Sequence, residues 1–103
     1  MSEVFAKREV IRAETLYADQ DISVALIALS GINRSTVNHG SATAYEVISG
    51  QGVMFVDYTM HALEPGTRVV VPKGTPYYDA GEDVVMWAVS SPPFNIDSVL
   101  EIK

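Results

Sequence analysis

The stretch that most constrains the fold is Leu63–Tyr78, with the sequence LEPGTRVVVPKGTPYY. Pro65 and Gly66 form a turn signal, and the mostly β-branched run Arg68–Val71 follows it. A second turn signal, Pro72–Gly74, comes directly after the valines. Three consecutive valines suit a strand that is covered on both faces, and the proline and glycine on either side limit its length. The stretch therefore predicts a short strand between two turns.

Similar short apolar runs recur along the rest of the chain. Three of them predict strands because they are β-branched and bounded by turn residues: Ile22–Leu29, Val53–Tyr58 and Val84–Val89. Val4–Leu16 is interpreted as a further strand, with an amphipathic helix as the alternative.

Glycine-containing segments separate these runs. Ser30–Gly31 is expected to end a strand, Gly50–Gly52 to form a hairpin, and Ala80–Asp83 to form another turn. Many short strands, frequent turns and little helical period favour an antiparallel sandwich or barrel. The predicted fold class is all-β, and about 100 residues suffice for a jelly-roll barrel.

Composition narrows the possible partners. The chain has 103 residues, which allows one core, and its net charge of −6 with only seven Lys and Arg argues against nucleic acid or anionic membrane as a partner. It has no cysteine, which excludes disulfides and thiolate chemistry. Its first residues include Glu3 and Glu9 and contain no long apolar run, so we expect a cytoplasmic protein without a secretory signal or a membrane span.

The spacing of Gly66, Pro72 and Gly74 resembles the second signature of the cupin family, G-x5-P-x-G-x2-H. The last position of that signature is Tyr77 here, in place of histidine. The first signature, G-x5-H-x-H-x3-4-E-x6-G, can be laid onto this chain with its last glycine at Gly50 and its leading glycine at Gly31. The resemblance implies a single cupin domain of the RmlC-like jelly-roll type over residues 1–103, with a barrel core at about residues 22–90.

The family's metal ligands are two histidines and a glutamate from the first signature and one histidine from the second. In this alignment they correspond to Val37, His39, Thr43 and Tyr77. Because transition-metal sites need three or four convergent ligands, the metal motif is degenerate and no cofactor is predicted. His39 would be the ligand if a metal bound. An alternative alignment ends the signature at Gly52 and makes Glu46 a ligand.

His39 and Tyr77 are the candidate catalytic residues, as a base and acid pair. A solvated loop histidine and a packed core tyrosine are the structural alternatives. Thr43 and Tyr45 share strand parity, so both are predicted to face one ligand pocket. Arg34 and Asn33 could contact a polar or anionic ligand at the rim, with a surface charge as the alternative for Arg34.

Trp87 is also a candidate ligand-binding residue, as a pocket wall, with a core position as the alternative. The resulting hypothesis is a small barrel that binds a polar or aromatic small molecule without a full metal site. The first alternative is a metal-independent sugar isomerase, epimerase or lyase, because some relatives of the resembled family work through a histidine base and a tyrosine acid. A metal-dependent cupin enzyme is the third reading, which the missing ligands disfavour. The resemblance also implies a homodimer, with the N-terminal segment and the tail Ile96–Ile102 as candidate surfaces.

Overall fold

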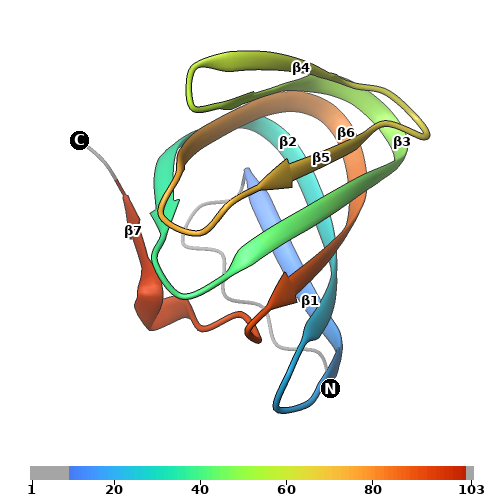
Figure 1. The fold of residues 1–103 in the computed structure, drawn as a ribbon. Coiled ribbons are helices and arrows are strands. Elements are labelled where there is room, and N and C mark those ends of the chain that lie inside the picture. Colours follow the sequence, from blue (N-terminus) through green and yellow to red (C-terminus); the bar gives the residue numbers. More distant parts are fainter. Residues whose placement is uncertain (1–9, 102–103) are drawn as a thin grey trace.

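The computed structural model describes residues 10–101. Its seven strands are β1 (Ile11–Ala18), β2 (Ser23–Asn38), β3 (Ala42–Val56), β4 (Thr59–Leu63), β5 (Arg68–Val71), β6 (Pro76–Ser91) and β7 (Val99–Glu101), with a 3-10 turn, η1 (Ile96–Ser98), before β7. All the strand pairings are antiparallel, and the strands curl into a barrel (Figure 1). The predicted all-β antiparallel barrel is therefore confirmed.

The three long strands are neighbours in the barrel wall, with β6 between β2 and β3. The short strands extend this group on both sides. The first half of β2 pairs with β1 and its end pairs with β7, whereas the first half of β3 pairs with β5 and its second half with β4. The seven strands thus form one continuous sheet, and each long strand runs through both of its halves, as in a jelly roll.

The two halves of the sheet meet at a row of glycines. Gly81 of β6 is paired with Gly31 of β2 on one side and with Gly52 of β3 on the other. A Cβ atom at Gly52 would overlap the carbonyl oxygen of Ala80, and one at Gly81 would lie 2.7 Å from that of Gln51. Neighbouring backbones approach so closely here that only glycine fits, and the pairing register shifts nearby in both ladders.

The glycines explain why one strand end and two turns predicted from the sequence are wrong. The chain continues as strand through Ser30–Gly31, Gly50–Gly52 and Ala80–Asp83. Glycine inside a strand can mark a sharp bend as readily as an end, and here it marks the bend. The hairpin turn after β3 lies instead at Asp57 and Tyr58, whose φ angles are 49° and 67°.

The packed core lies near this bend. Its most deeply buried side chains come from all three long strands and from β4: Leu29, Val47, Met54, Leu63, Val84 and Met86. Apolar residues that alternate along each strand point inward, as Val84, Met86 and Ala88 do on β6.

The structure describes only part of the two terminal segments for which predictions were made. Residues 4–9 and Ile102 lie outside the described residues, and Ile11–Leu16 belongs to β1, as the strand interpretation required. Within residues 10–101 there is no helix long and apolar enough to span a membrane.

Candidate functional site

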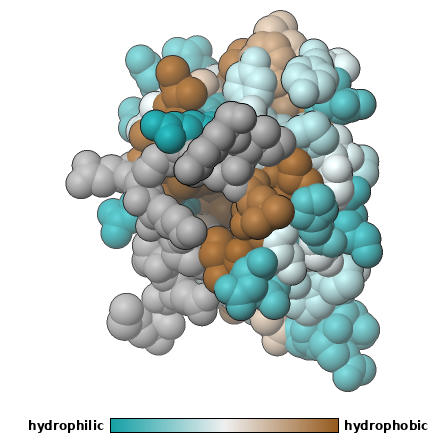
Figure 2. Space-filling model, turned by 90° about the vertical axis from the view of Figure 1, so that its left-hand side faces the viewer, coloured by the Kyte–Doolittle hydropathy of each residue, from teal (hydrophilic) through white to brown (hydrophobic). Residues whose placement is uncertain are grey.

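A cavity of about 170 Å³ lies inside the barrel. Figure 2 shows a hollow on one face of the molecule, with hydrophobic side chains along part of its edge. The apolar part of the cavity wall includes Ile11, Ile27, Val71, Met86, Ala88, Phe94, Ile96 and Val99. The polar part includes Ser23, Asn33, Thr36, Asn38, Ser41, Thr43, Tyr45, Tyr77, Asp79 and Ser90. A concave cavity in which polar groups converge among apolar side chains is a usual form of a small-molecule site.

Asp79 is the most unusual member of this wall, because only 1% of its surface is exposed. It lies opposite Asn33 in the pairing of β2 with β6, and Asn33 Nδ2 donates a hydrogen bond of 2.8 Å to Asp79 Oδ1. Burial raises the pKa of the Asp79 carboxyl to about 6, and the hydrogen bond from Asn33 opposes this rise in part. A carboxyl with this pKa can accept or release a proton close to neutral pH.

Two tyrosines, Tyr45 of β3 and Tyr77 of β6, lie beside Asp79. Their ring centroids are 6.4 Å apart, and Tyr45 donates a hydrogen bond to the Tyr77 hydroxyl. Burial raises the pKa of Tyr77 to about 12 and that of Tyr45 well above its usual range, and the negative charge of Asp79 raises both pKa values further. Both phenols therefore keep their protons in the resting site.

Hydroxyl and amide groups complete the polar wall. The Oγ1 of Thr43 and the Oγ of Ser90 are 2.9 Å apart, and either hydroxyl can donate the hydrogen bond. Asn38 Oδ1 accepts hydrogen bonds from the backbone N–H groups of Gly40 and Ser41, at 2.9 and 3.1 Å, which holds the chain where it leaves β2. These groups give the cavity several neutral donors and acceptors.

The C-terminal segment is held against the barrel by hydrogen bonds. Phe94 N–H donates to Ser23 Oγ at 2.9 Å, and Ser41 Oγ donates to the carbonyl oxygen of Pro92 at 2.7 Å. The backbone N–H of His39 donates to the carbonyl oxygen of Ser98 at 2.9 Å. These bonds place Phe94, and with it the apolar residues of the following turn and strand, at the cavity.

No protein-family model matches this sequence, and no curated protein matches it. Several solved structures are nevertheless similar. The nucleoside dehydratase Pac13 from Streptomyces, in a complex with uridine, has a TM-score of 0.86 at 22% identity, with 99% of this chain and 84% of that chain covered. KdgF from Halomonas has a TM-score of 0.79 at 13% identity, covering 92% and 90% of the two chains. Ectoine synthase from P. lautus has a TM-score of 0.77 at 13% identity, covering 95% and 80%. This chain has the cupin fold.

The cupin barrel brings together three of the residues singled out in the sequence. Thr43, Tyr45 and Tyr77 all line the cavity, Thr43 and Tyr45 from alternate positions of β3. Sequence reasoning put Asn33 only at the rim, next to Arg34, and did not place Asp79, whereas both line the cavity. Asp79 shares strand parity with Tyr77, which was a usable signal, but Asn33 could be placed beside it only through the pairing of β2 with β6.

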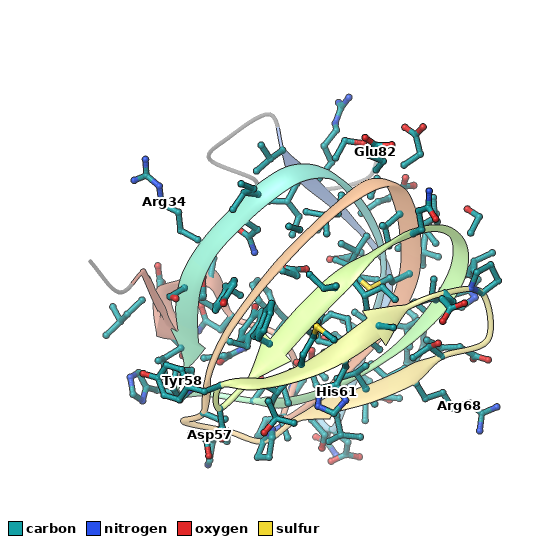
Figure 3. All side chains as sticks on the ribbon, turned by 90° about the horizontal axis from the view of Figure 1, so that it is seen from above. Arg34, Asp57, Tyr58, His61, Arg68 and Glu82 are labelled. Carbon is teal, nitrogen blue, oxygen red and sulfur yellow. The ribbon has the colours of Figure 1, made fainter. Side chains whose placement is uncertain are left out.

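The other three candidates do not line this cavity. His39 is exposed in the bend after β2, one residue beyond the inward-facing Asn38. Arg34 is exposed, and Figure 3 shows its side chain pointing away from the barrel. Trp87 is 37% exposed and alternates on β6 with Met86 and Ala88, whose side chains point inward.

The cupin metal site does not fit the groups found here. Within residues 10–101 there is no cluster of three or more His, Cys, Asp or Glu residues that could hold a metal ion. The cavity offers one carboxyl and two protonated phenols, which are a poor donor set for a transition metal. Glu46 is the ligand in the alternative alignment. Its Oε2 lies 3.6 Å from Nε of Arg68, and both side chains are substantially exposed. The expectation that the protein needs no cofactor stays a prediction.

Proposed function

We propose that this chain binds a small polar molecule of the nucleoside type in the barrel cavity and removes water from it by metal-independent acid–base catalysis. The observation that carries the proposal is a buried carboxyl, Asp79, with a pKa of about 6, beside two protonated tyrosines in the same cavity. Perturbed titratable groups inside a pocket are a mark of catalytic sites.

The similarity to Pac13 supports the class of reaction. Pac13 is a nucleoside dehydratase, and its structures with uridine include variants in which a tyrosine is changed to phenylalanine or a histidine to glutamine. The match extends over 99% of this chain. The present cavity has two tyrosines, Tyr45 and Tyr77, and Asp79 is the titratable carboxyl beside them.

The proposed step is the elimination of a hydroxyl group that lies β to a carbonyl, where the carbonyl acidifies the intervening C–H bond. The Asp79 carboxylate takes the proton from that carbon, and the C–O bond of the hydroxyl breaks as the double bond forms. Tyr77 donates its proton to the departing hydroxyl, which leaves as water. Asp79 then returns its proton to Tyr77, so the enzyme ends in its starting state.

The remaining groups suit binding and orientation. The hydrogen bond that Tyr77 accepts from Tyr45 stabilises the phenolate that forms when Tyr77 gives up its proton. The Thr43–Ser90 hydroxyl pair can offer a donor or an acceptor to the ring or sugar of a ligand. Aromatic side chains at the cavity supply faces for a planar ring.

The first test is calorimetric titration of the purified protein with uridine, followed by mass spectrometry for loss of one water from nucleosides that carry a carbonyl β to a hydroxyl. We expect Asp79→Asn to abolish turnover. Tyr77→Phe should reduce turnover by about 100-fold or more, because a general acid typically contributes about 10²- to 10⁴-fold to the rate. Tyr58→Phe is the matched control, because Tyr58 is 82% exposed in the β3–β4 turn. Turnover that survives Asp79→Asn would refute the proposed mechanism, and lack of binding by any nucleoside would refute the substrate class.

A further inference from the structure

We infer that the cavity selects uncharged ligands over their phosphorylated forms, and that the Asp79 carboxyl sets this selection. The inference rests on the proposed function and narrows it from nucleoside-type molecules in general to those without a phosphate group. It follows from the charge of the cavity wall and from the direction of the nearest basic side chains.

The wall carries a single full charge among the described residues. Asp79 is the one carboxyl that lines the cavity there, and no Lys, Arg or His within residues 10–101 lines it. The other polar groups are neutral hydroxyls and amides, such as those of Asn33, Asn38 and Ser90. Neutral groups of this kind can bind the hydroxyls and carbonyls of a nucleoside, but they do not balance the charge of a phosphate.

The basic side chains closest in sequence to the wall point elsewhere. Arg34 follows the buried Asn33 on β2, but it is exposed and its side chain projects away from the barrel (Figure 3). Arg12 lies between Ile11 and Ala13, which line the cavity, and it is exposed on the other side of β1. Because side chains alternate across a strand, neither arginine can supply a counter-charge inside the cavity without rearrangement of its strand.

A phosphorylated ligand would therefore bring negative charge close to a buried carboxylate. Like charges repel more strongly in a buried site than in water, and the phosphate would also lose its hydration. Asp79 could avoid the repulsion only by binding a proton. We expect a penalty of at least about tenfold in affinity at neutral pH for each added negative charge, which is a modest value for like charges at close range.

The test compares matched ligand pairs by calorimetry near neutral pH. The pairs are uridine with uridine 5′-monophosphate, cytidine with its 5′-monophosphate, and ribose with ribose 5-phosphate. We expect wild-type protein to bind the neutral member at least about tenfold more tightly, and Asp79→Asn to reduce this ratio by about tenfold. Asparagine keeps the shape of the side chain and can still accept the hydrogen bond from Asn33 Nδ2. Asp57→Asn, in the exposed β3–β4 turn, is the control and should leave the ratio unchanged.

A second measurement uses wild-type protein alone, so its result does not depend on whether Asp79→Asn folds correctly. The methyl diester of uridine 5′-phosphate carries one charge that stays constant over the accessible pH range. Its affinity relative to uridine should rise as pH falls from about 8 to about 5, because Asp79 then gains a proton. The titratable groups that face Asp79 are Tyr45 from β3 and Tyr77 from β6, and their raised pKa values keep both protonated throughout.

The outcomes separate this inference from the proposed function. Phosphorylated members that bind as tightly as the neutral ones would overturn the inference and leave nucleoside binding in place. A ratio that is the same in wild-type protein and Asp79→Asn, and that does not vary with pH, would overturn the role of Asp79. If no member of any pair bound, the proposed function would fail and the inference would fail with it.

Discussion

Replacing Asp79 with asparagine should stabilise the folded chain at neutral pH, even though it removes the proposed catalytic base. The carboxyl is almost completely buried, and its pKa rises from 3.8 to about 6 on folding. The folded state therefore disfavours the ionised form that the unfolded chain adopts freely in water. Asparagine is never ionised, so it avoids this cost while its side-chain oxygen can still accept the hydrogen bond from Asn33.

The sign and the size of the effect follow from proton linkage. Below about pH 4 the carboxyl is protonated in both the folded and the unfolded chain, so folding carries no penalty from ionisation. As pH rises toward 6, the unfolded chain loses the proton first and the free energy of unfolding falls. Above about pH 6 both states are ionised and the loss is complete. A rise of the Asp79 pKa from 3.8 to about 6 on folding corresponds to about 3 kcal/mol.

The assay is urea denaturation of wild-type protein and Asp79→Asn across the range from about pH 4 to about pH 8. The variant should be more stable by up to about 3 kcal/mol at the upper end, which is about 10 to 20 °C in Tm for a chain of this length, and the two should converge at the lower end. Asp57→Asn, at an exposed turn, should differ from wild type by less than about 0.5 kcal/mol. A stability difference that is independent of pH, or a variant that is less stable at neutral pH, would show that burial of Asp79 does not act as argued.

Three further substitutions test other parts of the structure. Gly52→Ala should cost more than about 3 kcal/mol in urea denaturation, because its Cβ would overlap the backbone carbonyl oxygen of Ala80, and a cost below about 1 kcal/mol would contradict the bend described here. Thr43→Val should cost about 1–3 kcal/mol because it leaves the buried Ser90 hydroxyl without its partner, and an unchanged unfolding midpoint would count against that. His39→Gln should change uridine affinity in calorimetry by less than about twofold, since His39 lies outside the cavity wall, whereas a loss above about tenfold would restore the histidine-base hypothesis.

Local patterns in the sequence predicted an antiparallel sandwich or barrel, and the resemblance to the cupin signatures selected the barrel. The prolines and glycines around Arg68–Val71 bound β5 as predicted, and the apolar run Val84–Val89 lies within β6. The predicted hairpin at Gly50–Gly52 failed because a glycine pair has the same appearance in sequence whether it ends a strand or bends one. Only the neighbouring backbone, which lies against Gly52 from β6, distinguishes the two cases.

The cavity could be predicted only in part, for a related reason. Because side chains alternate between the two faces of a strand, Thr43 and Tyr45 were predicted to face the same side, and both line the cavity. This alternation is reliable over a few residues of one regular strand. The alternation cannot be counted through an irregular segment, such as the register shift between Asn33 and Thr36 in the pairing of β2 with β6. His39 was assigned by aligning the family signature from Gly50, and in the structure it lies one residue past Asn38, the last residue of β2.

The hydrogen bonds of the site have a consequence for how the protein is made. Asn33 and Asp79 are 46 positions apart, Thr43 and Ser90 are 47 apart, and Ser23 and Phe94 are 71 apart. Contacts between such distant positions form late and slowly compared with local ones. During synthesis, a chain that stops before Phe94 lacks part of the cavity wall. Binding of the proposed ligand should therefore be a sensitive measure of complete folding, because a truncated chain lacks part of the cavity wall.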